Sequence, residues 1–279
     1  MQFVARLTDH PAIAGARSRS WAYKRQYRLD KAIRRALGAR PGPLPDPLVA
    51  DVCAGWGDAS LAGGDGFVTT CLAEAARGTG PVLQCGAGLM TLLLGIVAER
   101  ADTHLWTLEH DVHQANAVRS WLQQYEISKA HVIAAPPDIV EGCASYVVDY
   151  ARLPANFALV VCEGSSAVPG SAQGVLTRVG EHIHPQGVIL VHHAKRRRDV
   201  EFLAQWSKQA GASMVLKGKL EPFVKIAMRD PTPSGDHEAA RVNTAFAHQH
   251  KRSPQDLRRR IEAESGPIPV RSDVRRAHT

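Results

Sequence analysis

The sequence of 279 residues contains no apolar run close to the roughly 20 residues that a membrane-spanning helix needs. Its N-terminus also lacks the compact apolar stretch and small-residue cleavage site of a secretory signal peptide. The five cysteines are odd in number, widely spaced and include no C-x-x-C pair, which argues against both a disulfide framework and a zinc site. These absences predict a soluble, unsecreted protein, which we expect to be cytoplasmic.

The formal net charge of +7 comes from the two ends of the chain, and the middle is slightly acidic. Residues 1–40 hold ten Lys or Arg against two acidic residues, and residues 251–279 hold eight against four. The segment RSRSWAYKRQYRLDKAIRRALGAR predicts a helix that packs on the core by its aromatic face. Alternatives are a contact with a partner, an anionic substrate, RNA or a membrane surface, and an organellar transit peptide.

Short β-rich runs alternate with helix-like segments in the central part of the chain, which indicates parallel strands joined by crossover helices. These runs are PVLQCG, HLWTLEH, HVIAAP, FALVVCEG and GVILVHH. Two further runs, SMVLKG and FVKIAMR, are separated only by residues 219–222, a link too short for a crossover helix, so these strands must be antiparallel. The prediction is a doubly wound α/β fold with a mostly parallel seven-stranded sheet and a C-terminal antiparallel hairpin.

Composition divides the chain into three parts. We expect a basic helical extension over residues 1–45 and a Rossmann-like domain over residues 46–230. Residues 231–279 are polar, basic and rich in breakers, which predicts a tail that is partly disordered or helical.

The stretch GPVLQCGAGLMTLLLGIVAER joins an apolar strand to an apolar helix through a loop that carries Gly86 and Gly88. Ligands of open α/β sheets bind beyond the carboxyl ends of the strands, where such glycines let the backbone approach them. A dinucleotide fingerprint needs a third glycine where Thr91 stands, and a P-loop needs the absent G-K-[ST], so NAD and ATP are disfavoured. Glu109 ends the second strand 23 residues after Gly86, close to the spacing at which an acid meets ribose hydroxyls.

The region from about Gly80 to Arg229 resembles the class I S-adenosylmethionine-dependent methyltransferases, whose sheet ends in such a hairpin. The resemblance is closest to the branch with the motifs GPVLxCGxGLxTLLL and LEHD, and it implies S-adenosyl-L-methionine as the cofactor. Two positions depart from the family, which usually has an acid where Gln84 stands and a small residue where Met90 stands. The implied cofactor-binding residues are Gln84, Cys85, Gly86, Ala87, Gly88, Thr91, Glu109, His110, Ala135, Pro136, Glu163 and Gly164.

Three residues at the ends of strands four and five are the predicted catalytic residues. Glu163 lies where related enzymes carry an acid facing the methyl group, and His192 and His193 end the next strand. An imidazole suits the deprotonation of a hydroxyl or amine near neutral pH, and alternation alone leaves open which histidine faces the site. The same three residues would suit a transition metal better than Mg²⁺, but we favour a reaction without a metal.

The sequence predicts methyl transfer to a small-molecule acceptor, most readily at oxygen, with a histidine assisting deprotonation. One alternative is an RNA methyltransferase that uses the basic ends, although the sequence has no [DN]-P-P-[FY] motif and no Pro-Cys nucleophile. The other is a non-catalytic partner protein with a degenerate cofactor loop. We expect a small-molecule substrate, no membrane span and a homodimer as one option for assembly; a nucleic acid partner is not favoured.

Overall fold

The computed structural model describes residues 16–57, 66–140, 143–163, 171–192, 197–218 and 222–228. The predicted tail over residues 231–279 lies outside this part. The helices are α2 (Ala16–Leu37), α3 (Asp46–Trp56), α5 (Phe67–Arg77), α6 (Leu89–Ala101), α7 (Val112–Gln124), η1 (Tyr150–Arg152), α8 (Ser171–Val179), η2 (Gly180–His182) and α9 (Arg197–Gln209). The strands are β1 (Val82–Cys85), β2 (Leu105–Glu109), β3 (Ala130–Ala134), β4 (Pro137–Val140), β5 (Cys143–Tyr146), β6 (Phe157–Cys162), β7 (Ile183–Val191), β8 (Ser213–Lys217) and β9 (Phe223–Ala227).

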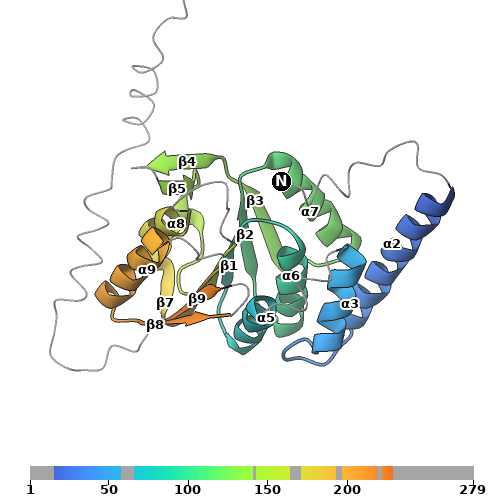
Figure 1. The fold of residues 1–279 in the computed structure, drawn as a ribbon, viewed down its shortest axis with the longest axis horizontal. Coiled ribbons are helices and arrows are strands. Elements are labelled where there is room, and N and C mark those ends of the chain that lie inside the picture. Colours follow the sequence, from blue (N-terminus) through green and yellow to red (C-terminus); the bar gives the residue numbers. More distant parts are fainter. Residues whose placement is uncertain are drawn as a thin grey trace, which may run out of the picture.

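Seven strands form one sheet in the order β3-β2-β1-β6-β7-β9-β8 (Figure 1). The strands from β3 to β7 pair in parallel, whereas β9 is antiparallel to both β7 and β8. The predicted α/β architecture and its C-terminal antiparallel hairpin are therefore confirmed. The central strand β1 is buried at all four positions because helices cover both faces of the sheet.

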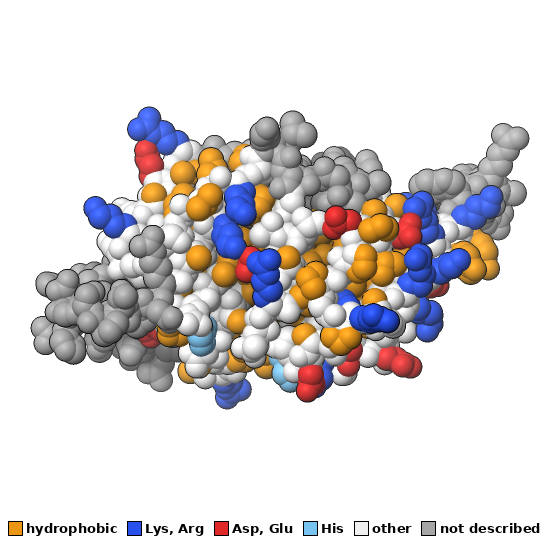
Figure 2. All heavy atoms as spheres, turned by 90° about the horizontal axis from the view of Figure 1, so that it is seen from below, with side chains coloured by type: hydrophobic (Ala, Val, Ile, Leu, Met, Phe, Trp, Pro, Cys, Tyr) orange, Lys and Arg blue, Asp and Glu red, His pale blue; other side chains and the backbone are white. Residues whose placement is uncertain are grey.

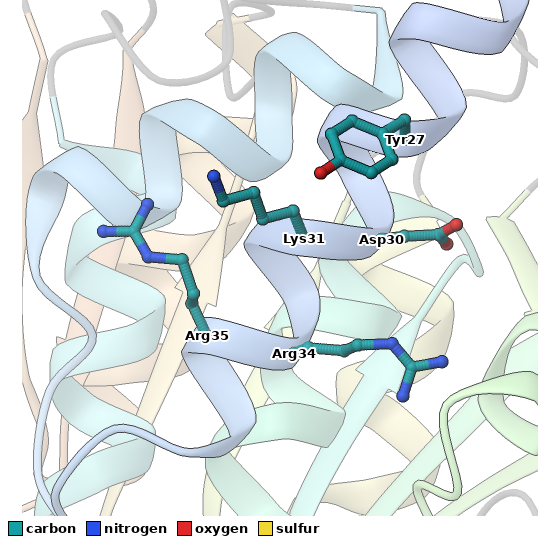
Figure 3. A pocket seen from close by; sticks show the side chains of 5 residues that line it. All are labelled: Tyr27, Asp30, Lys31, Arg34 and Arg35. Carbon is teal, nitrogen blue, oxygen red and sulfur yellow. The ribbon is translucent and has the colours of Figure 1, made fainter.

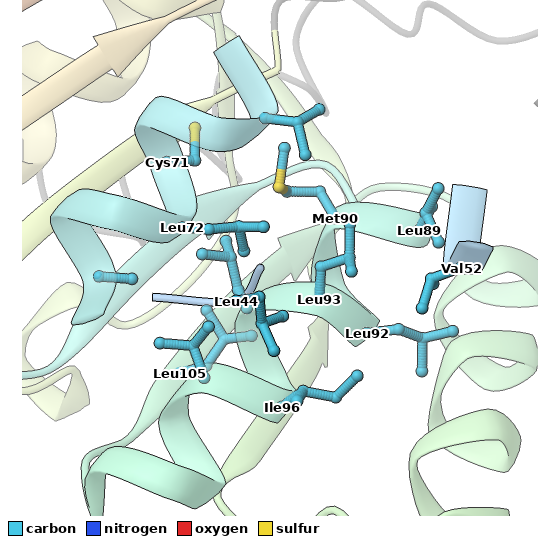
Figure 4. Packing of buried hydrophobic residues seen from close by; sticks show 14 of the residues in the cluster. Leu44, Val52, Cys71, Leu72, Leu89, Met90, Leu92, Leu93, Ile96 and Leu105 are labelled. Atoms are coloured by element: carbon cyan, nitrogen blue, oxygen red, sulfur yellow. The ribbon is translucent and has the colours of Figure 1, made fainter. Parts of the chain in front are cut away.

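Two hydrophobic clusters lie on opposite faces of the sheet. One face packs against α5, α6 and α7, with α3 and α2 behind them, and the other packs against α8 and α9 (Figure 1). Helix α6 is apolar around most of its circumference, because α5, α2, α3 and α7 all surround it. Figure 4 shows Leu92, Leu93 and Ile96 of this helix packed among Leu72 of α5 and Val52 of α3.

Helix α2 packs into the same core by an aliphatic stripe, which consists of Leu29, Ala32, Ile33 and Ala36. Its backbone crosses α3 closely at Gly55, where an added Cβ would lie 2.7 Å from the Cα of Leu29.

The tyrosines of α2 do not take part in this packing. Tyr23 and Tyr27 are 73% and 60% exposed, so the prediction that α2 packs by its aromatic face is wrong for these two residues. Small and aliphatic side chains permit the close helix crossing that tyrosines would prevent.

Strands β4 and β5 form a separate antiparallel hairpin that the sequence analysis did not predict. It follows β3 directly at the carboxyl edge of the main sheet, and β5 packs against α8. An ion pair of 3.7 Å between Asp138 and Arg178 joins the hairpin to α8. Strands of four residues carry too short an alternation to be distinguished from a loop in the sequence.

Candidate active site at the carboxyl edge of the sheet

Four polar residues at the ends of four strands lie on one face of the sheet. Side chains alternate between the two faces along each strand, so positions two apart share a face. Val82, Leu105, Leu159 and Leu190 belong to the cluster beneath α5, α6 and α7. Continuing the alternation to the carboxyl edge places Gln84, Glu109, Glu163 and His192 on this same face.

The loop between β1 and α6 has the backbone conformation that its glycines predict. Gly86 has a φ of 99°, in the left-handed region that side chains disfavour. It lies beside Glu163, whose Cβ would be 3.6 Å from a Cβ added at Gly86. The amide of Gly88 donates to the buried hydroxyl of Thr91 at 3.0 Å, which fixes the start of α6. Met90 is buried in the core beside this turn (Figure 4).

The carboxylate of Glu109 holds the glycine loop against the end of β2. It accepts hydrogen bonds from the backbone N–H groups of Ala87 at 2.6 Å and Asp111 at 2.8 Å. The exposed His110 ring places its Nδ1 2.9 Å from the same carboxylate. Glu109 is only 4% exposed, so its orientation is fixed from two sides. Each carboxylate oxygen has two lone pairs, which leaves acceptor capacity for a ligand.

Gln84 and Glu163 form a hydrogen-bonded pair across β1 and β6. The Gln84 Nε2 donates to the Glu163 Oε1 at 2.6 Å, and the Thr107 hydroxyl of β2 donates to the Gln84 Oε1 at 3.1 Å. Gln84 and Thr107 are fully buried, whereas Glu163 is partly exposed. The predicted cofactor-binding residue Gln84 therefore uses its amide within the protein.

Burial raises the pKa of Glu163 to about 7. The hydrogen bond from Gln84 acts in the opposite direction, and the nearby Glu109 carboxylate raises the pKa further. A carboxyl group with this pKa exchanges its proton near neutral pH, as a general acid or base must.

His192 packs inside the site rather than standing free in it. Its ring stacks on Phe67 of α5 with centroids 4.1 Å apart and planes 7° apart, and His192 is 9% exposed. Phe67 in turn meets Phe223 edge to face at 5.4 Å. His193 lies outside the described residues, as does Gly164.

Two further polar residues that the sequence did not predict, Gln114 and Tyr146, lie near the site. Gln114, in the first turn of α7, donates from Nε2 to the carbonyl of Ala87 at 2.9 Å. Its Oε1 is buried and has no hydrogen-bond partner among the described residues. Burial raises the pKa of Tyr146 on β5, and the charges of Cys85 and Glu109 raise it further. The short spacing after the LEHD motif could have indicated Gln114, whereas Tyr146 depends on the unpredicted hairpin.

The remaining predicted residues line the edge without making polar side-chain contacts in the site. Cys85 pairs in register with Cys162 of β6, and both are buried on the face of α8 and α9. Ala135 is buried after β3, and the exposed Pro136 leads into the hairpin. In the part of the chain that the structure describes, no group of three or more His, Cys, Asp or Glu could hold a metal ion.

A hollow lies along α2, away from the carboxyl edge of the sheet (Figure 3). All of its lining residues belong to this one helix: Tyr27, Asp30, Lys31, Arg34 and Arg35. Exposed Lys and Arg side chains gather at this end of the molecule (Figure 2). Asp30 is held by the Tyr125 hydroxyl of α7, so the hollow is part of the attachment of α2. None of the described helices has both the length and the apolar character to cross a membrane.

The comparisons with known proteins concern the fold. No protein-family model matches the chain, and neither does any curated protein. The precorrin-6Y C5,15-methyltransferase from Geobacter metallireducens is 14% identical, with 58% of this chain and 87% of that chain covered and a TM-score of 0.44. The C-terminal domain of the Rhodobacter capsulatus enzyme of that name is 14% identical, covering 61% and 89%, with a TM-score of 0.42.

A SAM-dependent methyltransferase from Aquifex aeolicus is 12% identical, covering 54% of this chain and 82% of that chain, with a TM-score of 0.39. Similarity at this level does not identify an activity. This chain's own sheet, with five parallel strands followed by an antiparallel pair, has the architecture expected from the resemblance to class I methyltransferases.

Proposed function

We propose that this chain binds S-adenosyl-L-methionine at the carboxyl edge of its sheet and transfers the methyl group to a small-molecule acceptor, at oxygen. The observation that carries the proposal is the Ala87 peptide, which is held from both sides. The Glu109 carboxylate accepts a hydrogen bond from the Ala87 N–H at 2.6 Å, and the Gln114 side-chain amide donates one to the Ala87 carbonyl at 2.9 Å. These two bonds fix the backbone of the glycine loop at the carboxyl edge of the sheet.

The donor and acceptor groups of this edge fit the cofactor. Glu109 has spare acceptor capacity for ribose hydroxyls, and the buried Oε1 of Gln114 is a further acceptor beside the loop. The cofactor carries a sulfonium and an ammonium group. Two carboxylates, Glu109 and Glu163, face the site, and among the described residues no Lys or Arg pairs with either. A positively charged ligand would relieve the repulsion between them.

The chemistry that the cofactor supplies is a methyl group on a sulfonium sulfur, which an oxygen nucleophile displaces in line. The chain's contribution is to position the acceptor and to take its proton. Glu163 is the better placed proton acceptor of the two described candidates, because it is partly exposed and has a pKa of about 7. His192 is stacked against Phe67, and in this proposal it shapes the acceptor pocket, while assistance by His193 stays a prediction.

A ligand panel tests the cofactor assignment. We expect S-adenosylhomocysteine to raise the melting temperature of the protein, and NAD⁺ and ATP to leave it unchanged, because only the first matches this loop. If no ligand with an S-adenosyl group changes the melting temperature or releases heat in calorimetry, the proposal fails. The result would then favour the non-catalytic partner protein.

A further inference from the structure

We infer that Gln84 is a positioning residue, which holds Glu163 in the orientation that accepts a proton from the methyl acceptor. The inference rests on the proposed function, and it gives Gln84 a role different from direct contact with the cofactor. The feature that carries it is a relay of three side chains from three adjacent strands. It runs from Thr107 on β2 through Gln84 on β1 to Glu163 after β6.

The ionised Glu163 carboxylate fixes which end of the Gln84 amide faces it, because a carboxylate only accepts hydrogen bonds, whereas the Thr107 hydroxyl can donate or accept. The Gln84 Nε2 therefore donates to the Glu163 Oε1 at 2.6 Å, and the Thr107 hydroxyl donates to the Gln84 Oε1. Thr107 and Gln84 are both 0% exposed, so neither can exchange its partner for water. A buried amide that lost either bond would leave a polar group unsatisfied. The amide therefore donates to Glu163, and the second carboxylate oxygen is left for the acceptor.

An acid at position 84 could not hold Glu163 as the ionised proton acceptor. Two carboxyl groups at hydrogen-bond distance share one proton, so one of them has a strongly raised pKa. Gln84 is neutral and donates a hydrogen bond, so Glu163 is the only ionisable member of the pair.

The other groups around Glu163 do not replace Gln84 in this role. The Glu109 carboxylate at the end of β2 opposes ionisation of Glu163. The thiols of Cys71 on α5 and Cys85 on β1 are neutral at physiological pH. Burial raises the pKa of Cys71, and the hydrogen bond with Cys162, together with burial, raises the pKa of Cys85. Among the described residues, His110 contacts the Glu109 carboxylate, Tyr146 lies on the adjoining β5, and His192 follows β7 and stacks on Phe67. Among the described groups around Glu163, Gln84 is thus the one that favours its ionised form.

The experiment measures the titration of Glu163 directly, in the protein without cofactor or substrate. Carbon NMR of the glutamate carboxyl groups, assigned with Glu163→Gln, gives the pKa in the wild type and in Gln84→Leu. A hydrogen bond to a charged group contributes about 1.5–3 kcal/mol, so we expect the pKa of Glu163 to rise by about 1 to 2 pH units in Gln84→Leu. An unchanged pKa in a folded Gln84→Leu protein would overturn the inference.

Two isosteric variants protect the test against misfolding of Gln84→Leu. Thr107→Val removes the hydroxyl that donates to the Gln84 Oε1, and we expect a smaller rise in the same direction. Thr103→Val is its control, because the Thr103 hydroxyl donates to the Gly80 carbonyl at 2.9 Å, at the opposite edge of the sheet. It should leave the pKa of Glu163 unchanged. Equal shifts in both variants, or a shift in neither, would contradict the relay.

Turnover separates this inference from the proposed function. In Gln84→Leu we expect the acid limb of the kcat profile to move upward in pH together with the pKa from NMR, with little change in cofactor affinity. Turnover whose pH profile does not move would overturn the positioning role and leave methyl transfer standing. The NMR shift in a protein that neither binds S-adenosylhomocysteine nor transfers a methyl group would overturn the proposed function and leave only the side-chain pairing.

Discussion

Replacing Glu109 by Gln should weaken both the fold and the binding of the cofactor. In the wild type, one carboxylate oxygen accepts from the Ala87 N–H at 2.6 Å and the other from the Asp111 N–H at 2.8 Å. The amide of Gln has only one acceptor oxygen, so its NH₂ group would face a backbone donor. Leaving a buried donor unsatisfied costs about 1–3 kcal/mol, and we expect the free energy of unfolding to fall by this amount.

The effect on affinity follows from the ribose contacts that we propose. A hydrogen bond to a charged group contributes about 1.5–3 kcal/mol, which corresponds to a roughly 10- to 150-fold loss of affinity for S-adenosylhomocysteine. Isothermal titration calorimetry measures this loss, and urea unfolding measures the stability. The control is Glu99→Gln, because Glu99 also accepts two backbone N–H groups, from Ser128 and Lys129 at 2.8 and 2.9 Å, but on a single oxygen. The amide oxygen of Gln can keep both bonds, so this variant should keep its stability and its affinity.

A ligand without the ribose 2′-hydroxyl separates the direct contact from loop distortion. If Glu109 binds the ribose, the wild type should bind the 2′-deoxy analogue more weakly, and Glu109→Gln should discriminate much less between the two ligands. Equal discrimination by wild type and variant would refute the ribose contact and leave Glu109 as a support for the loop alone.

The remaining predictions concern the loop, the strand-end acid and the stacked histidine. Gly86→Ala forces a side chain to a φ of 99°, so we expect a loss of about 1–2 kcal/mol in urea unfolding and weaker cofactor binding; unchanged binding would contradict the loop assignment. The folded-state pKa of Glu163, about 7, lies above that of an unfolded glutamate, so the folded protein retains a proton that the unfolded chain has lost. The free energy of unfolding of the wild type should therefore fall as the pH rises from about 4.5 to 7. Glu163→Gln should flatten this dependence and, after allowance for partial exposure, be more stable than the wild type by about 1–2 kcal/mol at pH 8. Parallel curves of stability against pH for the two proteins would contradict the raised pKa. His192→Ala should lower the melting temperature by removing the stack on Phe67, and leave the pH limb assigned to Glu163 in place; loss of that limb would make His192 the base.

The sequence predicted the sheet well because each strand carries its own pattern. The parallel order follows from the alternation of strands and helices, and the antiparallel pair follows from the short link over residues 219–222. The same period of two carries Gln84, Glu109 and Glu163 to one face of the carboxyl edge.

Contacts between distant segments could not be predicted in this way. Gln84 and Glu163 are 79 residues apart, and their bond depends on β1 and β6 being neighbours in register. The stack of His192 on Phe67 depends on where α5 begins above the sheet, and no local pattern encodes this. The packing of α2 by its aliphatic stripe could not be predicted, because the sequence does not show how closely α3 approaches at Gly55.

A crystal structure of the protein with S-adenosylhomocysteine would show directly whether the carboxyl edge of the sheet binds the cofactor. We expect the ribose hydroxyls within hydrogen-bond distance of Glu109, the amino acid part of the ligand across Gly86, and the sulfur facing a space bordered by Glu163. Gln84 should keep its bond to Glu163 in that complex. A ligand bound elsewhere, or one whose ribose avoids Glu109 while its sulfur points away from Glu163, would contradict the account.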